Sequence, residues 1–206
     1  MSSVARLRRL ASAGASTTTR RAPPTADGER CDLCGRPIPE DHRHLLEMHD
    51  RRIECACEPC WAMRSGEDRY RPVGTRVAWL PDLRLSDERW AAFGIPIGLA
   101  FFMRSTISES VVGMYPSPAG ATESQLDLAA WDALREDNPI LAGLEPDTEG
   151  LIVDRVADPH RYAIAPIDEC YKLVGLVKAS WEGISGGDAL AGALDGFFEE
   201  LRIRGQ

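Results

Sequence analysis

The sequence lacks long apolar runs and an excess of basic residues, and each absence excludes a class of protein. No stretch approaches the roughly 18–20 apolar residues that span a bilayer, so we expect no membrane span. The 32 acidic residues outnumber the 24 basic ones and give a net charge of −8, which argues against a nucleic-acid binder. The acidic excess lies in residues 100–206, so a basic partner would dock there.

The N-terminus lacks the apolar segment of a secretory signal. Residues 1–29 contain arginine, serine, threonine and alanine but no periodic apolar pattern, so we expect a disordered basic tail. This predicts a cytoplasmic protein. Because thiols stay reduced in the cytoplasm, clustered cysteines there favour metal binding over disulfides.

The thirty residues from Cys31 to Cys60 contain five of the six cysteines. Two C-x-x-C pairs, Cys31/Cys34 and Cys57/Cys60, flank a segment that is predicted to form a short β-hairpin. Two thiolates on one tight turn reach a single ion, and two such turns supply four sulfurs at a tetrahedral centre. We therefore predict a zinc-ribbon-like module over residues 30–61 in which these four cysteines bind Zn²⁺.

Cys55 is a fifth thiol that a four-cysteine site does not need. Side chains at positions 55 and 57 of a strand point the same way, which places this sulfur near the ion. Three interpretations stay open: a buried small hydrophobic residue, an outer-shell thiol or alternative ligand, and part of an iron–sulfur or redox site. A Cys3His site can also use His42, His44 or His49, but we interpret each histidine as a surface residue of the hairpin.

Iron is the alternative to zinc. A rubredoxin centre also holds one ion between two C-x-x-C turns, and each of those turns is typically followed by glycine. Here Gly35 follows the first pair, whereas Trp61 follows the second. This difference favours zinc and leaves iron as the second hypothesis.

The rest of the chain predicts an α+β domain. Residues 62–97 contain several extended or turning segments with proline and are expected to connect the module to a domain over residues 98–206. Apolar patterns predict strands at 99–105, 110–115, 148–156 and 162–165, and helices from Thr122 to about Glu136, from Asp168, and from Asp188 to about Ile203. This order of elements, with short hairpin connections, predicts an antiparallel sheet with helices on one face.

No catalytic residue is predicted. His160, Asp168 and Cys170 are close together in the sequence, and a thiol with an imidazole can form a nucleophilic pair. Cys170 lies on the apolar face of a predicted helix, however, and Asp168 suits the first turn of that helix. We therefore favour a buried core cysteine, because an enzyme using these residues would need an open pocket that joins them.

A run of motifs resembles one uncharacterised bacterial family. The motifs are CDLCG, HRHLL, CACEPC, IPIGLAFFMRS, YPSPAGATES, PIDECYKLVGL, WEGISGG and FFEEL. Only two of the 24 basic residues are lysine, which is likewise typical of GC-rich bacterial genomes. Members of the family are often encoded beside nickel–iron hydrogenase genes, and a cysteine cluster with a CxCxxC arrangement, here Cys55, Cys57 and Cys60, is typical of them.

The resemblance implies an accessory protein without enzymatic activity. It would assist assembly, maturation or docking of a nickel–iron hydrogenase, with a hydrogenase subunit or maturation factor as its partner. Zinc would hold the hairpin together, because thirty residues bury too little core to fold alone. The alternative is a rubredoxin-like iron protein that transfers electrons for the same hydrogenase.

Overall fold

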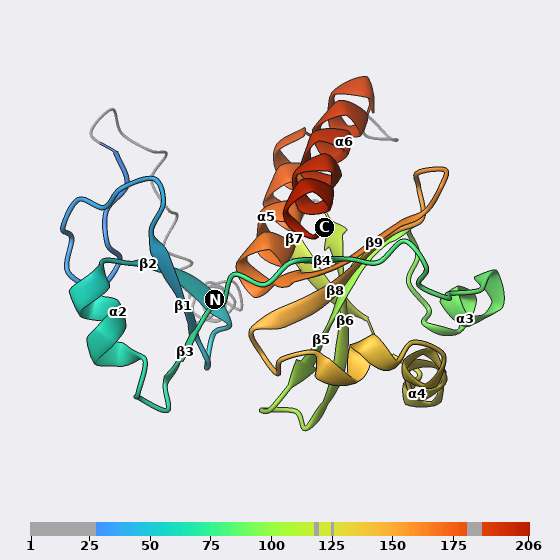
Figure 1. The fold of residues 1–206 in the computed structure, drawn as a ribbon, viewed down its shortest axis with the longest axis horizontal. Helices are drawn as coiled ribbons and strands as arrows, with labels where there is room; N and C mark the ends of the chain where they lie inside the picture. Colours follow the sequence, from blue (N-terminus) through green and yellow to red (C-terminus); the bar gives the residue numbers. More distant parts are fainter. Residues whose placement is uncertain (1–27, 118–119, 125, 181–186) are drawn as a thin grey trace, which may run out of the picture.

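The computed structural model describes residues 28–117, 120–124, 126–180 and 187–206. These residues form a small module with a three-stranded sheet and a larger domain with a six-stranded sheet. Figure 1 shows the module at the left and the larger domain at the right, joined by the extended segment from β3 to β4. Most of the expected N-terminal tail lies outside the described residues. Within the described ranges, no helix is both long and apolar enough to cross a membrane.

The small module is built on the expected β-hairpin. Its elements are β1 (Arg43–Glu47), β2 (Arg52–Ala56), helix α2 (Glu58–Arg64) and β3 (Tyr70–Pro72). β1 pairs antiparallel with β2 on one side and with β3 on the other. Leu45 and Leu46 are buried. Arg51 has a φ of 50°, and this left-handed conformation helps the chain to turn into β2.

The larger domain contains an antiparallel sheet in the order β4-β9-β8-β5-β6-β7. Its strands are β4 (Ala78–Trp79), β5 (Leu99–Ser105), β6 (Ser110–Ser117), β7 (Gly120–Ser124), β8 (Glu149–Asp154) and β9 (Arg161–Pro166). The central strands β5 and β8 are buried at nearly every position, so both faces of the sheet are covered. The edge strand β4 is capped by the end of the last helix, because Trp79 N–H donates to Gly205 O over 3.2 Å.

Helices pack on both faces of this sheet. They are α3 (Asp87–Ala92), α4 (Leu128–Asp137), the 3-10 helix η1 (Pro139–Gly143), α5 (Ile167–Ser180) and α6 (Gly187–Arg204). The long helices α5 and α6 form one core with Phe101 and Ile152, and the shorter helices form the other with Phe102 and Leu151. The α+β class is confirmed, but the expectation of helices on one face is wrong: both faces of the buried central strands need cover, so the long helices lie on one face and the shorter ones on the opposite face.

One predicted helix start is wrong. Thr122 lies in β7, where it pairs with Tyr115 and its Oγ1 donates to Ser117 Oγ over 2.9 Å. Helix α4 begins after Asp127, whose carboxylate accepts from Ala129 N–H over 2.9 Å. Pairing with β6 therefore overrides the local capping pattern. Residue 125, which would complete a capping box with Thr122, and Trp181, at the end of the helix predicted from Asp168, lie outside the described residues.

The segment from 62 to 97 contributes to both parts of the molecule. It completes α2 and adds β3 to the small sheet, and it then adds β4 to the large sheet and forms α3. The two parts also touch directly. Arg51 Nη2 donates to Ser105 Oγ over 3.3 Å, its Nη1 lies 3.6 Å from Glu123 Oε2, and Ile53 packs against the core beneath α5 and α6.

Candidate metal centre

Four cysteines come together in the small module. Cys31 and Cys34 lie on a tight turn in which Gly35 N–H donates to Cys31 O over 2.8 Å. Gly35 has a φ of 72°, a conformation that glycine adopts without strain. The second pair lies at the start of α2, with Cys57 as its N-cap and Cys60 in its first turn. The sequence predicted a second tight turn here, but one helical turn also brings residues i and i+3 to the same face.

The sulfur positions fit one tetrahedral ion. The four Sγ atoms lie within 4.8 Å of one another, and the Sγ atoms of Cys34 and Cys57 are 3.7 Å apart. Four sulfurs bonded at about 2.3 Å to a tetrahedral ion would lie about 3.8 Å from each other. Cys31 and Cys57 are buried, whereas Cys34 is exposed. The four cysteines predicted as ligands thus lie together in a set that can bind a metal ion.

The thiols of this cluster differ in acidity. Burial acts to raise the pKa of Cys31, but hydrogen bonds from the backbone of Cys57, Leu33 and Cys34 outweigh it and lower this pKa to about 7. Burial, followed by hydrogen bonding to the neighbouring cysteines, raises the pKa of Cys60 to about 12. A bound cation offsets the mutual repulsion of thiolates, which are the form that binds metal.

Hydrogen bonds fix the two cysteine pairs relative to the hairpin. Asp32 N–H donates to Cys55 O over 2.8 Å, and Cys55 N–H donates to Asp32 Oδ2 over 2.6 Å. Two hydrogen bonds therefore join the turn of the first cysteine pair to β2. Helix α2 is held against β1 by Arg43, which donates to Glu58 Oε2 over 2.7 Å and stacks 4.1 Å from the ring centroid of Trp61.

A second group of metal-binding side chains, His42, His44 and Cys55, lies in the same module. Their ligand atoms also lie within 4.8 Å of one another. The side chain of His42 is only 5% exposed, so its interpretation as a surface residue is wrong, and His44 is half-buried. His49 is exposed as expected. The hairpin register could have revealed this group from the sequence. His42 and His44 share a face of the hairpin, and Cys55 pairs with His44 across it.

Asp168 joins this second group to the larger domain. Its Oδ2 lies 2.7 Å from His44 Nδ1, across 124 residues of sequence. The hydrogen bond to Asp168, together with one to Cys55, raises the pKa of His44 to about 10 against the opposing effect of burial. A cleft of about 800 Å³ lies at this boundary and is lined by both histidines, Asp168, Glu169 and Arg204, among others. Sequence reasoning missed this constellation because its members come from both parts of the fold.

The sequence neighbours His160, Asp168 and Cys170 form no common pocket. Cys170 is fully buried in the core beneath α5, and this burial raises its pKa well above the usual value. His160 is exposed just before β9 begins, beside Tyr162, whereas Asp168 and Cys170 follow the other end of this strand. The expectation of a buried core cysteine is confirmed. Asp168 does begin α5, but its carboxylate contacts His44.

Comparisons with known proteins place the chain in a family. Neither the curated proteins nor the solved structures gave a match. A family model described as "Family of unknown function (DUF5947)" matches residues 30–205. This range includes all six cysteines, the second group of ligands and every described strand and helix. The chain therefore belongs to the DUF5947 family.

Proposed function

We propose that the chain is a non-enzymatic accessory protein whose small module is held together by a structural Zn²⁺ and docks onto a protein partner. The observation that carries this proposal is the set of four cysteine sulfurs within 4.8 Å of one another. Four thiolates complete a tetrahedral coordination shell and leave no position for a substrate, as in structural zinc sites. The apolar clusters beside the site are small, so the ion would supply much of the folding energy of the module.

The placement of the second cysteine pair favours zinc over a rubredoxin-like iron centre. A rubredoxin centre uses two C-x-x-C turns, whereas Cys57 and Cys60 lie at the N-terminal end of α2. This arrangement supports a closed, redox-inactive site. The alternative is an iron centre that transfers electrons, and the experiment below distinguishes it from a structural zinc site.

The partner is proposed from the resemblance of the motifs to a family encoded beside nickel–iron hydrogenases. The chain would then bind a hydrogenase subunit or a maturation factor in the bacterial cytoplasm. The acidic excess of residues 100–206 supports a partner surface of positive charge. The chain would assist assembly, maturation or docking of the hydrogenase.

Metal analysis combined with a visible spectrum of natively purified protein tests the metal assignment. A colourless protein that contains zinc and loses it in Cys34→Ser supports the proposal. A red protein with charge-transfer absorption and bound iron supports the electron-transfer alternative instead.

A pull-down with the tagged full-length chain tests the partner. Co-purification of hydrogenase subunits or maturation factors with the wild type, and their loss with Cys34→Ser, is the expected result. Absence of every hydrogenase protein from the wild-type eluate would overturn the docking claim and leave the zinc assignment standing.

A further inference from the structure

The two histidines of the second group face each other through their Nε2 atoms, which are 3.1 Å apart. His42 Nδ1 lies 2.9 Å from Pro39 O and 3.1 Å from Glu40 O, and carbonyl oxygens only accept hydrogen bonds. His44 Nδ1 lies 2.7 Å from the carboxylate of Asp168, which also accepts. Each Nδ1 therefore carries a proton. With a proton on each Nδ1 only, both Nε2 lone pairs point at each other, so either a proton, which the raised pKa of His44 favours, or a metal ion lies between them.

Cys55 supplies a third donor at the same point. Its Sγ lies within 4.8 Å of the ligand nitrogens of both histidines, and the residue is 4% exposed. Hydrogen bonds at Nδ1 fix the tautomer and orientation of both rings, as they do for histidines that bind metals through Nε2. The cysteine is fixed as well, because its backbone N–H donates to Asp32. The donor set is thus oriented before any ion arrives.

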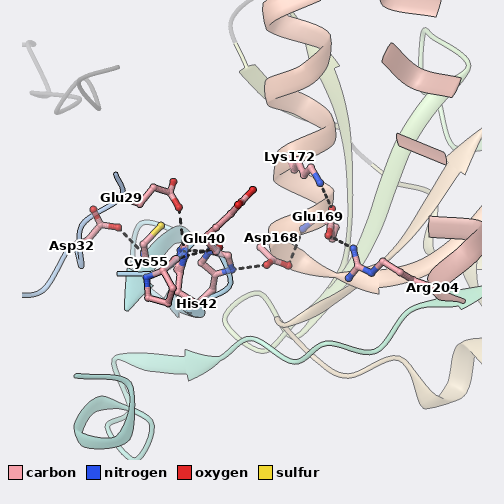
Figure 2. A network of polar contacts seen from close by, with 11 residues as sticks. Glu29, Asp32, Glu40, His42, Cys55, Asp168, Glu169, Lys172 and Arg204 are labelled. Carbon is pink, nitrogen blue, oxygen red and sulfur yellow. Dashed lines mark hydrogen bonds and ion pairs between the residues drawn. The ribbon is translucent and has the colours of Figure 1, made fainter. Parts of the chain in front are cut away.

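The charge around these donors favours a cation. Glu29 Oε2 lies 3.5 Å from His42 Nδ1, and Asp168 contacts His44 on the other side. Figure 2 shows this chain of contacts running from Glu29 through the histidines to α5. Glu169, the next carboxylate along, is already paired with Arg204 over 2.5 Å and with Lys172 over 3.4 Å. Asp168 is therefore the helix carboxylate that acts on the histidines.

We propose that His42, His44 and Cys55 form a second metal site, separate from the four-cysteine cluster, which binds a divalent transition metal through two imidazole nitrogens and one thiolate. Imidazole and thiolate together suit ions such as Zn²⁺ and Co²⁺. Binding replaces the proton of the Cys55 thiol, which leaves to solvent. Three protein ligands leave a fourth position that water or an incoming ligand fills, and the cleft at the boundary gives access to the histidines.

Metal stoichiometry tests the proposal with Zn²⁺ as the probe. The full-length chain is saturated with Zn²⁺, desalted, and analysed by mass spectrometry of metals. We expect two ions per chain in the wild type and one in His42→Gln and in Cys55→Ser. His49→Gln is the matched control, because this histidine is exposed in the same hairpin, and it should keep two ions. Cys34→Ser should lose the ion of the other cluster, which separates failure of this proposal from failure of the structural-zinc proposal.

Co²⁺ gives an independent readout that does not depend on counting ions. Bound Co²⁺ absorbs through charge transfer from thiolate sulfur. In Cys55→Ser, the absorbance should fall by the contribution of one thiolate, while the bands of the four-cysteine cluster remain. Circular dichroism of each variant shows whether the fold is kept. A variant that unfolds is replaced by His44→Gln, which removes a ligand of the same set.

Asp168 is a positioning residue in this site. Asp168→Asn keeps the size of the side chain but removes the charge that orients His44. We expect the affinity of the second site for Zn²⁺ to fall about 10–100-fold, as measured by competition with a chromophoric chelator, while the four-cysteine site is unchanged. One ion per chain in the Zn²⁺-saturated wild type, or two in Cys55→Ser, would overturn the proposal. The contact between the histidines would then be a shared proton.

Discussion

Glu47 is a carboxylate buried within β1, and its side chain is only 3% exposed. Its Oε1 accepts from Arg69 Nε over 3.0 Å, and its Oε2 accepts from Asp50 N–H over 2.8 Å. Burial acts to raise the pKa of Glu47, but the hydrogen bonds from Asp50 and Arg69 outweigh it and lower this pKa below the usual value. The charged form is therefore the one that stabilises the hairpin.

Glu47→Gln should lower the free energy of unfolding by about 1–3 kcal/mol at pH 7, because hydrogen bonds to a buried charged group are lost or weakened. A lowered pKa contributes stability above the unfolded-state pKa, and that contribution is lost as the pH falls through the folded-state pKa. The difference between wild type and variant should therefore shrink under acid conditions. Urea unfolding at pH 7 and at about pH 3.5 measures it, with Glu40→Gln as an exposed control in the same module. A difference that is independent of pH would contradict the prediction.

Gly150 leaves room for the buried thiol of Cys170. A Cβ at position 150 would lie 2.7 Å from Cys170 Sγ, closer than packed atoms approach. Gly150→Ala should therefore destabilise the larger domain by about 1–3 kcal/mol through overpacking. Cys170→Ala removes the sulfur, so the double variant should be more stable than the sum of the two single effects predicts. Strictly additive unfolding energies would show that the sulfur is not the obstacle.

Helix α4 starts directly after its N-cap residue, Asp127, and two variants test this position. Asp127→Ala removes the carboxylate that accepts from Ala129 N–H and should cost about 1 kcal/mol. Thr122→Val keeps a β-branched residue in β7 and removes only the hydroxyl that donates to Ser117, so its cost should be smaller. Thermal unfolding of both variants measures the costs. A larger loss for Thr122→Val would favour a helix that begins at the earlier position.

The strands β5, β6, β8 and β9 of the large sheet were predictable because each carries its own signal. β5 and β8 are almost wholly apolar, and the turns from β5 to β6 and from β8 to β9 are short, so local pattern and tertiary pairing agree. β7 was missed because GATES has little apolar character and becomes a strand only by pairing with β6. The two-residue β4 was missed for the same reason, since its partner β9 is more than eighty residues later. Whether such a segment forms a strand depends on its pairing with a distant segment. A short window of the sequence does not contain this information.

The two groups of side chains that could hold a metal ion differ in how local their sequence signal is. Each C-x-x-C pair is a local pattern, so the first group could be named from the sequence alone. The second group combines a strand, its hairpin partner and Asp168, which begins a helix of the other part. The hairpin register predicts that the histidines and Cys55 lie close together. Nothing near His44 in the sequence, however, indicates that the carboxylate of Asp168 contacts it. The sequence therefore indicated the four cysteines that the structure brings together, but not the group at the boundary.

Removal of metal should affect the two parts of the molecule unequally. The larger domain has two apolar cores, whereas the small module has only minor clusters around its cysteines. Treatment with a strong chelator should therefore abolish protection against hydrogen exchange in β1 and β2 while β5 and β8 stay protected. Restoration of Zn²⁺ should return the protection. Unchanged exchange in β1 and β2 after verified metal loss would show that the module folds without an ion.

The hydrogen bond from Trp79 to Gly205 has a consequence for the order in which the chain folds during synthesis. All strands of the small module and its five cysteines lie at or before β3, so we expect the four-cysteine cluster to assemble before most of the larger domain has been made. The edge strand β4 leaves the ribosome early as well, but the segment that covers it is made last, and a side chain at position 205 would meet the backbone of Trp79 at 2.5 Å. A nascent chain halted before α6 should thus carry a metal-loaded module beside an open sheet edge, the state most exposed to aggregation.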